Sequence, residues 1–124
     1  MIETPYEGTF FGALDLGGDA LLAYGLRGNA WRSGDAGESW EPVELGQPNS
    51  ITSSLSLANG ALLLADEGGR LLRSDDGGQS FVPLPTTAGA GLTGMIETRD
   101  GALVLSGARG LVRVESGAIA LGAE

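Results

Sequence analysis

Two short segments contain closely spaced carboxylates, which are the side chains of this sequence that most resemble a metal-binding or catalytic site. Residues 33–40 read SGDAGESW and residues 74–81 read SDDGGQSF, so both follow the pattern Ser-x-Asp-x-Gly-x-x-aromatic. The defining positions are Ser33, Asp35, Gly37 and Trp40 in the first, and Ser74, Asp76, Gly78 and Phe81 in the second. The neighbouring carboxylates Asp75 and Asp76 are a possible calcium ligand pair, but the run lacks the ligand spacing of a calcium loop.

A structural role explains each position of the pattern. Short Asp and Ser side chains accept hydrogen bonds from backbone N–H groups of their own turn. Glycine adopts the positive φ that a tight turn requires. The aromatic residue folds back as an apolar plug beneath the loop. We therefore interpret both segments as structural turns and predict neither a metal site nor a catalytic residue in them.

Composition removes further kinds of chemistry. The chain has no cysteine and no histidine, which excludes disulfides, zinc sites of the usual type and thiol or imidazole catalysis. Seven basic residues, all arginine, stand against 16 acidic ones, giving a net charge of −9. Nucleic acid is therefore not an expected partner, because its phosphates need a cationic surface. No window is long and apolar enough to cross a bilayer.

One glycine motif resembles a cofactor site. Residues 89–94 read GAGLTG and match the dinucleotide-binding pattern G-x-G-x-x-G. That pattern requires a buried strand before it and a helix after it. Pro83–Thr87 precedes it instead of a buried strand, and no helical pattern follows. We interpret the segment as a crossover between strands and predict no cofactor.

The elements that position these residues recur every 41 residues. Ala20-Leu21-Leu22 returns as Ala61-Leu62-Leu63 and as Ala102-Leu103-Val104, and Gly28, Gly69 and Gly110 share one offset. Each repeat consists of short apolar runs separated by glycine-rich turns, which is typical of antiparallel strands. The expected strands are Phe10–Leu16, Leu21–Tyr24, Ile51–Leu57, Ala61–Ala65, Arg70–Ser74, Ser80–Leu84, Leu92–Thr98 and Leu103–Ser106.

The period predicts the fold. Four short strands every 41 residues match the length of a β-propeller blade. A sandwich of irregular strands is the alternative, but it predicts no fixed period. We expect an all-β chain of three four-stranded antiparallel blades at about 10–50, 51–91 and 92–124, with 1–9 as a possible ring-closing strand. The third repeat lacks the turn motif, and its outer strand is expected at Ala118–Leu121.

The motif and its flanking segments resemble known families. The two turns resemble the Asp-boxes, or BNR repeats, of bacterial sialidases. Sialidase chemistry needs an arginine cluster, a tyrosine nucleophile and acidic partners, and only Tyr6 and Tyr24 are present. Residues 5–12 (PYEGTFFG), 25–33 (GLRGNAWRS) and the Asp-box are more similar to the photosystem II stability/assembly factor family and its bacterial relatives. This resemblance covers most of residues 5–82, and the chain resembles the C-terminal half of a member.

The resemblance implies a function and candidate contacts. Members of that family are complete propellers that bind other proteins and have no catalytic activity, so we expect a non-catalytic protein-binding scaffold. A carbohydrate-binding or sialidase-like propeller is the alternative. The family's arginine-rich surface implies Arg27, Arg32, Arg73 and Arg109 as possible partner-binding residues. The alternative, which repeat geometry favours, is that arginines at repeated positions pair with Asp or Glu of the next blade. The resemblance implies a periplasmic or extracellular location, although this chain carries no signal peptide.

Three blades leave two blade faces without a neighbour. We expected those faces to include Leu14, Leu16, Leu21, Leu55, Leu57, Leu62 and Leu103. Monomeric soluble proteins rarely expose apolar patches beyond a few hundred Å². Propellers close with roughly 4–8 blades, and two chains of three would supply six. The sequence therefore predicts a homodimer that closes one six-bladed ring, the alternative being that this is a fragment of a longer chain.

Overall fold

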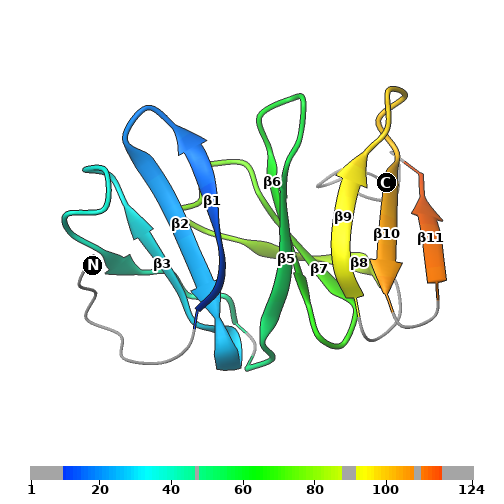
Figure 1. Ribbon diagram of the computed structural model, residues 1–124, viewed down its shortest axis with the longest axis horizontal. Coiled ribbons are helices and arrows are strands. Elements are labelled where there is room, and N and C mark those ends of the chain that lie inside the picture. The colour runs from blue at the N-terminus through cyan, green and yellow to red at the C-terminus, as the bar shows by residue number, and fades with distance from the viewer. Residues whose placement is uncertain (1–9, 47, 88–91, 108–109, 116–124) are drawn as a thin grey trace.

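The computed structural model describes residues 10–46, 48–87, 92–107 and 110–115, which form three antiparallel sheets arranged side by side (Figure 1). The first blade contains β1 (Phe10–Gly17), β2 (Ala20–Gly25), the 3₁₀ turn η1 (Leu26–Gly28), β3 (Ala30–Ser33) and β4 (Glu41–Pro42). The second contains β5 (Ile51–Ser56), β6 (Leu62–Asp66), β7 (Arg70–Ser74) and β8 (Val82–Thr87). The third contains β9 (Leu92–Glu97), β10 (Leu103–Gly107) and β11 (Gly110–Val114).

The all-β class and the blade pattern predicted from the repeat are confirmed. Strands within each blade pair in sequence order, in sheets of four, four and three described strands. The fourth strand expected at Ala118–Leu121 and the closing strand expected within residues 1–9 lie outside the described residues. No helix among the described residues is long and apolar enough to span a membrane.

The fourth strand of the second blade differs from its prediction. We expected Ser80–Leu84, followed by a proline-containing segment that is not a buried strand. The strand instead begins at Val82 and continues to Thr87, through Pro83 and Pro85. It lies at the end of its sheet, paired only with β7. An edge strand tolerates proline because one side of its backbone needs no partner.

The repeat is also visible in the strand register. In each blade, one residue of the second strand pairs with an apolar residue of the first strand and with an arginine of the third strand. These sets are Leu22 with Leu14 and Arg32, Leu63 with Leu55 and Arg73, and Val104 with Ile96 and Arg113. The spacing is 41 throughout except at Arg113, which stands one residue early. The β10–β11 hairpin is therefore one residue shorter than its counterparts.

Two apolar cores lie between the blades. The core between the first and second blades contains Leu22, Tyr24, Ala30, Val43, Leu45, Ile51, Leu62, Leu64, Leu72 and Phe81. The core between the second and third contains Leu57, Ala61, Leu63, Ala65, Leu71, Leu84, Met95, Leu103, Leu105 and Val114. Successive residues of β6 alternate between the two cores, as the pleat of a strand requires.

This packing corrects the list of residues expected on uncovered faces. Leu57, Leu62 and Leu103 are buried in the two cores. Leu14 and Leu16 pack against the first core and Leu55 against the second. The sequence pattern identified apolar strand positions correctly, but it did not give the direction in which each face points around the ring.

Candidate functional site

The first serine-led turn, Ser33–Trp40, is organised by the hydroxyl group of Ser33. This buried side chain donates to Asp35 Oδ1 at 2.8 Å. Its oxygen also accepts the backbone N–H of Gly37 at 2.8 Å. Gly37 has φ 93°, a conformation that is favourable for glycine only. The serine thus supplies the hydrogen-bond acceptor inside a turn whose backbone folds away from the strand ladder.

The carboxylate of Asp35 completes the turn. It accepts the backbone N–H of Ser39 at 2.8 Å and the Ser39 hydroxyl at 2.6 Å. The side chain of Ser39, then its backbone N–H and then the Ser33 hydroxyl lower the pKa of Asp35 to about 2. These donors favour the charged form, so the group stays ionised at neutral pH. A permanently ionised, hydrogen-bonded carboxylate is suited to holding the turn and unsuited to donating a proton.

The second serine-led turn, Ser74–Phe81, repeats this arrangement. Ser74 Oγ donates to Asp76 Oδ1 at 2.8 Å and accepts the N–H of Gly78 at 3.0 Å. The backbone N–H of Ser80 donates to Asp76 Oδ1 at 3.0 Å. The Ser80 hydroxyl, followed by its backbone N–H, lowers the pKa of Asp76 to about 2. Both turns therefore use the same side chain-to-backbone bonds.

The aromatic residues that end the two turns occupy different places. Phe81 is buried in the core between the first and second blades. Trp40 is half-buried, and its indole Nε1 donates to the carbonyl oxygen of Gly37 at 3.0 Å. Phenylalanine thus packs as an apolar plug, whereas tryptophan also closes its own turn through a hydrogen bond.

The repeated arginines are engaged within the fold. Arg32 Nε donates to the carbonyl oxygen of Gly77 in the next blade at 2.9 Å. Arg73 pairs with Asp75, its NH2 group lying 3.0 Å from Oδ1, and its side chain is largely covered. Arg109 lies outside the described residues. Among the described residues no three acidic side chains are grouped as in a metal site.

Arg27 differs from these arginines in exposure and in backbone conformation. It is exposed, lies in η1, and has φ 59° and ψ 31°. The turn is held by the N–H of Gly25 donating to the Asn29 carbonyl at 2.9 Å. The N–H of Arg27 donates to Ser50 Oγ at 3.2 Å, which ties the turn to the entrance of the second blade. Its guanidinium forms no ion pair with any described residue.

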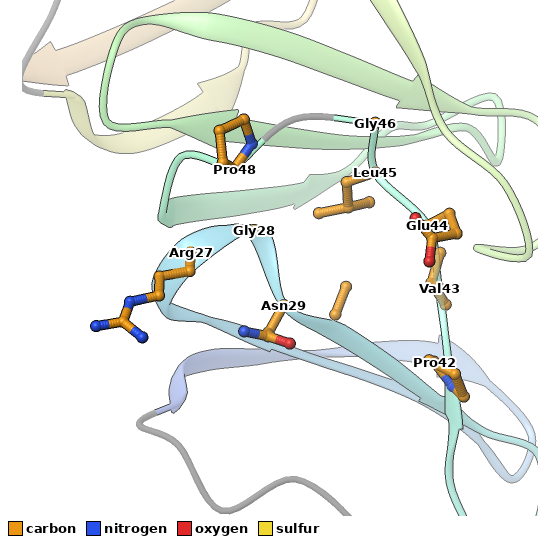
Figure 2. A pocket seen from close by; sticks show the side chains of 10 residues that line it. Arg27, Gly28, Asn29, Pro42, Val43, Glu44, Leu45, Gly46 and Pro48 are labelled. Carbon is orange, nitrogen blue, oxygen red and sulfur yellow. The ribbon is translucent and has the colours of Figure 1, made fainter.

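A pocket opens beside Arg27. It has a volume of about 450 Å³ and lies between η1 and the segment that leads from β4 to β5. Its lining is Arg27, Gly28, Asn29, Ala30, Pro42, Val43, Glu44, Leu45, Gly46 and Pro48. Figure 2 shows Asn29 and Leu45 on facing walls and Arg27 at one end, with its guanidinium directed outward. The wall combines backbone, apolar side chains, the amide of Asn29 and the carboxylate of Glu44, with the Arg27 cation at one end.

Comparison with known proteins gives structural matches only. No family model matches the chain, and no curated protein matches it. A structure described as YCF48 bound to D1 peptide superimposes with a TM-score of 0.78 at 19% identity, covering 96% of this chain and 40% of that chain. An ancestral GH74 enzyme superimposes with a TM-score of 0.71 at 14% identity, covering 85% of this chain and 17% of that chain.

The chain has the β-propeller fold. At such low identities the two matches show the fold alone. The chain spans well under half of either structure that it matches. One of the two is an enzyme and the other is described with a bound peptide, so the fold by itself is a general scaffold.

The pocket was not anticipated as a site, although the sequence pointed to Arg27. Val43, Leu45 and Pro48, which line it, belong to the connection between two blades. Val43 recurs as Leu84, but Leu45 and Pro48 correspond to Thr86 and Gly89, so the 41-residue period carries little signal for this part of the pocket. The run Pro42–Pro48 holds alternating apolar residues between two prolines, which in hindsight marks an ordered connection.

Proposed function

We propose that this propeller segment is a non-catalytic scaffold that binds another protein, and that it holds an acidic extended segment of that protein at Arg27. The observation that carries the proposal is Arg27 at the mouth of a pocket, in a left-handed backbone conformation and with no ion pair to any described residue. A left-handed conformation costs a residue with a side chain about 1–2 kcal/mol. Glycine would fit η1 better, which supports a binding role for the arginine side chain.

The surroundings of Arg27 favour a protein ligand. The pocket volume falls within the roughly 300–1,000 Å³ typical of ligand sites. Backbone groups of Gly28 and Gly46 lie in its wall, and they offer hydrogen bonds to another backbone. Arginine binds carboxylates through two parallel N–H bonds. In a chain of net charge −9, an exposed cation that forms no ion pair with the described residues favours an anionic group of the partner.

A non-catalytic role is consistent with the carboxylates of the described residues. Asp35, Asp76 and Asp100 all have their pKa lowered to about 2. A glycosidase needs one carboxyl group whose pKa is raised, so that it can protonate the leaving oxygen. The bound peptide of the YCF48 structure adds an example of peptide binding on this fold. The GH74 enzyme keeps carbohydrate binding as the second candidate.

A peptide array tests the proposal directly. Wild-type chain and Arg27→Gly are probed on an array of 12-residue peptides of varied charge, with Arg99→Gly as a matched control from an exposed loop of the third blade. We expect wild type and the control to favour acidic peptides. Arg27→Gly should lose roughly 10–100-fold in affinity, as expected for the loss of hydrogen bonds to a charged group.

The same experiment includes its own structural control. Because glycine is comfortable at φ 59°, Arg27→Gly should melt no lower than wild type, so lost binding would not reflect unfolding. Equal peptide binding by wild type and Arg27→Gly would overturn the proposed site. Binding to a parallel array of neutral and sialylated oligosaccharides, with no peptide binding, would overturn the protein-binding function.

A further inference from the structure

The third blade exposes an apolar face on the side away from the second blade. Ile96 of β9 is 61% exposed and Leu111 of β11 is 76% exposed. Val104 of β10 pairs with Ile96 and is half-buried between them on the same face. The opposite face of the same sheet carries Leu103 and Leu105, which are fully buried against the second blade.

The repeat shows what this exposed face is built to contact. In strand register, Ile96, Val104 and Leu111 occupy the places of Leu55, Leu63 and Leu71 in the second blade. Leu63 and Leu71 are completely buried because the third blade covers them, and Leu55 packs beside them. In the first blade the same places hold Leu14, Leu22 and Ala30, which the second blade covers. The third blade therefore presents the face on which the next blade packs.

The outer face of the first blade carries the complement of that face, although Ala23 is buried and Leu21 and Trp31 are half-buried in the single chain. Leu21, Ala23 and Trp31 occupy the places of Leu62, Leu64 and Leu72, with which the second blade packs against the first. Leu21 is only half-buried, whereas Leu62 is buried in a core. Each single chain thus carries both halves of one more blade-to-blade contact, one at either end of the row of blades in Figure 1.

We propose that two copies of this chain close one six-bladed ring, with Ile96, Val104 and Leu111 of each copy packed against Leu21, Ala23 and Trp31 of the other. One pair of such contacts satisfies both ends of both chains, as two-fold symmetry requires. Propellers close with roughly 4–8 blades. Two copies of these three blades give six, which lies within that range.

A polar contact between two blades of the chain has an expected equivalent at the proposed interface. Arg32 of the first blade donates to the carbonyl oxygen of Gly77 in the turn of the second blade. Arg113 holds the register position of Arg32 in the third blade; its side chain is nearly half exposed and pairs with Asp100 and Glu115, each at 2.8 Å. The position of Gly77 corresponds to Ala36 in the first blade. The closed ring therefore places Arg113 near the carbonyl oxygen of Ala36 in the second copy.

Sedimentation velocity on the wild-type chain at micromolar concentration tests the ring. We expect one species of twice the chain mass. Leu111→Arg should raise the dimer dissociation constant roughly a hundredfold or more, because it buries an unpaired charge. Val82→Arg is the matched control, since Val82 is 45% exposed on the edge strand of the middle blade and faces neither end of the row.

Mixing two variants tests the pairing of the faces. Leu111→Arg and Leu21→Arg should each be monomeric alone, while a mixture should dimerise in part, because one of its two contacts is then free of both substitutions. A wild-type monomer would overturn the proposal, as would open higher oligomers. A dimer that resists Leu111→Arg as well as it resists Val82→Arg would overturn this interface. The proposal concerns ring closure and does not depend on Arg27 binding an acidic segment.

Discussion

The guanidinium of Arg32 donates from Nε to the carbonyl oxygen of Gly77 at 2.9 Å, joining β3 of the first blade to the serine-led turn of the second. A second polar contact, between Tyr24 Oη and Ser54 Oγ at 2.9 Å, joins the same two blades. These contacts flank the apolar core between the blades. The turn around Gly77 is therefore part of how blades hold together, which explains why its geometry repeats.

Removal of the Arg32 contact should weaken the link between blades. We expect Arg32→Ala to lower the free energy of unfolding by about 0.5–1.5 kcal/mol, the usual contribution of one hydrogen bond. Arg99→Ala, in an exposed loop of the third blade, is the control and should change stability little. Urea unfolding measures both. Equal losses in the two variants would show that the Arg32–Gly77 contact contributes nothing.

The hydroxyl of Ser33 should matter more than that of Ser39. Ser33 is 1% exposed, and its removal leaves the N–H of Gly37 without an acceptor inside the turn. We expect Ser33→Ala, and Ser74→Ala likewise, to cost about 1–3 kcal/mol of unfolding free energy. Ser39→Ala removes an exposed hydroxyl and should cost less. A chemical denaturation series that ranks Ser39→Ala above Ser33→Ala would contradict this account.

The two turns were predictable because the hydrogen bonds of their Ser and Asp side chains lie within eight residues of sequence. The same is true of the strands, whose apolar runs and glycine turns follow the 41-residue period. Other features depend on contacts between repeats. The sequence could not show that Arg32 donates a hydrogen bond to Gly77 of the next blade. It could not show that Leu62 is buried while Ile96 is exposed. Nor could it show that Pro48 lies across a pocket from Asn29. Those depend on how neighbouring blades are placed.

Ala36 and its counterpart Gly77 share a left-handed backbone conformation, but only Ala36 carries a side chain that this conformation strains. Their φ values are 62° and 76°, both in the region that disfavours a side chain. We expect Ala36→Gly to stabilise the chain, and Gly77→Ala to destabilise it by about 1–2 kcal/mol. A Cβ at Gly77 would lie 3.8 Å from the Arg32 guanidinium, an ordinary contact, so the loss would come from the backbone. Thermal unfolding checks the pair, and shifts of the same sign would contradict the prediction.

Acid should destabilise the chain through the carboxylates of the two turns. The pKa values of Asp35 and Asp76 are about 2, below the ordinary value of 3.8. A lowered pKa in the folded state contributes stability that is present above the ordinary value and is lost as pH falls toward the folded value. Stability should therefore decline between about pH 4 and pH 2, as urea unfolding at several pH values would show.

A double variant tests whether the hydroxyls of Ser39 and Ser80 cause this acid sensitivity. Ser39→Ala combined with Ser80→Ala removes the hydroxyl that lowers the pKa of each carboxylate most, so both pKa values should rise toward 3.8. Asp100, whose pKa is lowered to about 2 by Thr98 and Arg113, should be unaffected and serves as the internal control. Carboxyl carbon shifts followed by NMR during a pH titration report all three groups. Unchanged titration of Asp35 and Asp76 would refute the assigned cause.

The last prediction concerns Asp66, a buried carboxylate that only the second blade contains. Its side chain is fully buried, and Oδ1 accepts the backbone N–H groups of Gly68 and Arg70, each at 2.9 Å. The corresponding places in the other blades are Gly25 and Gly107, so the repeat gives no signal for this acceptor. Asp66 organises the β6–β7 turn much as Asp35 organises its own.

Substitution separates the geometry of the Asp66 acceptor from its charge. Asp66→Ala removes the acceptor for both N–H groups and should lower the free energy of unfolding by about 1.5–3 kcal/mol, as for hydrogen bonds to a charged group. Asp66→Asn keeps one side-chain oxygen in place, so we expect it to lose less than half as much. Asp19→Ala, at an exposed turn of the first blade, is the control. If Asp66→Asn proved as costly as Asp66→Ala in urea unfolding, the charge rather than the placed oxygen would hold the turn.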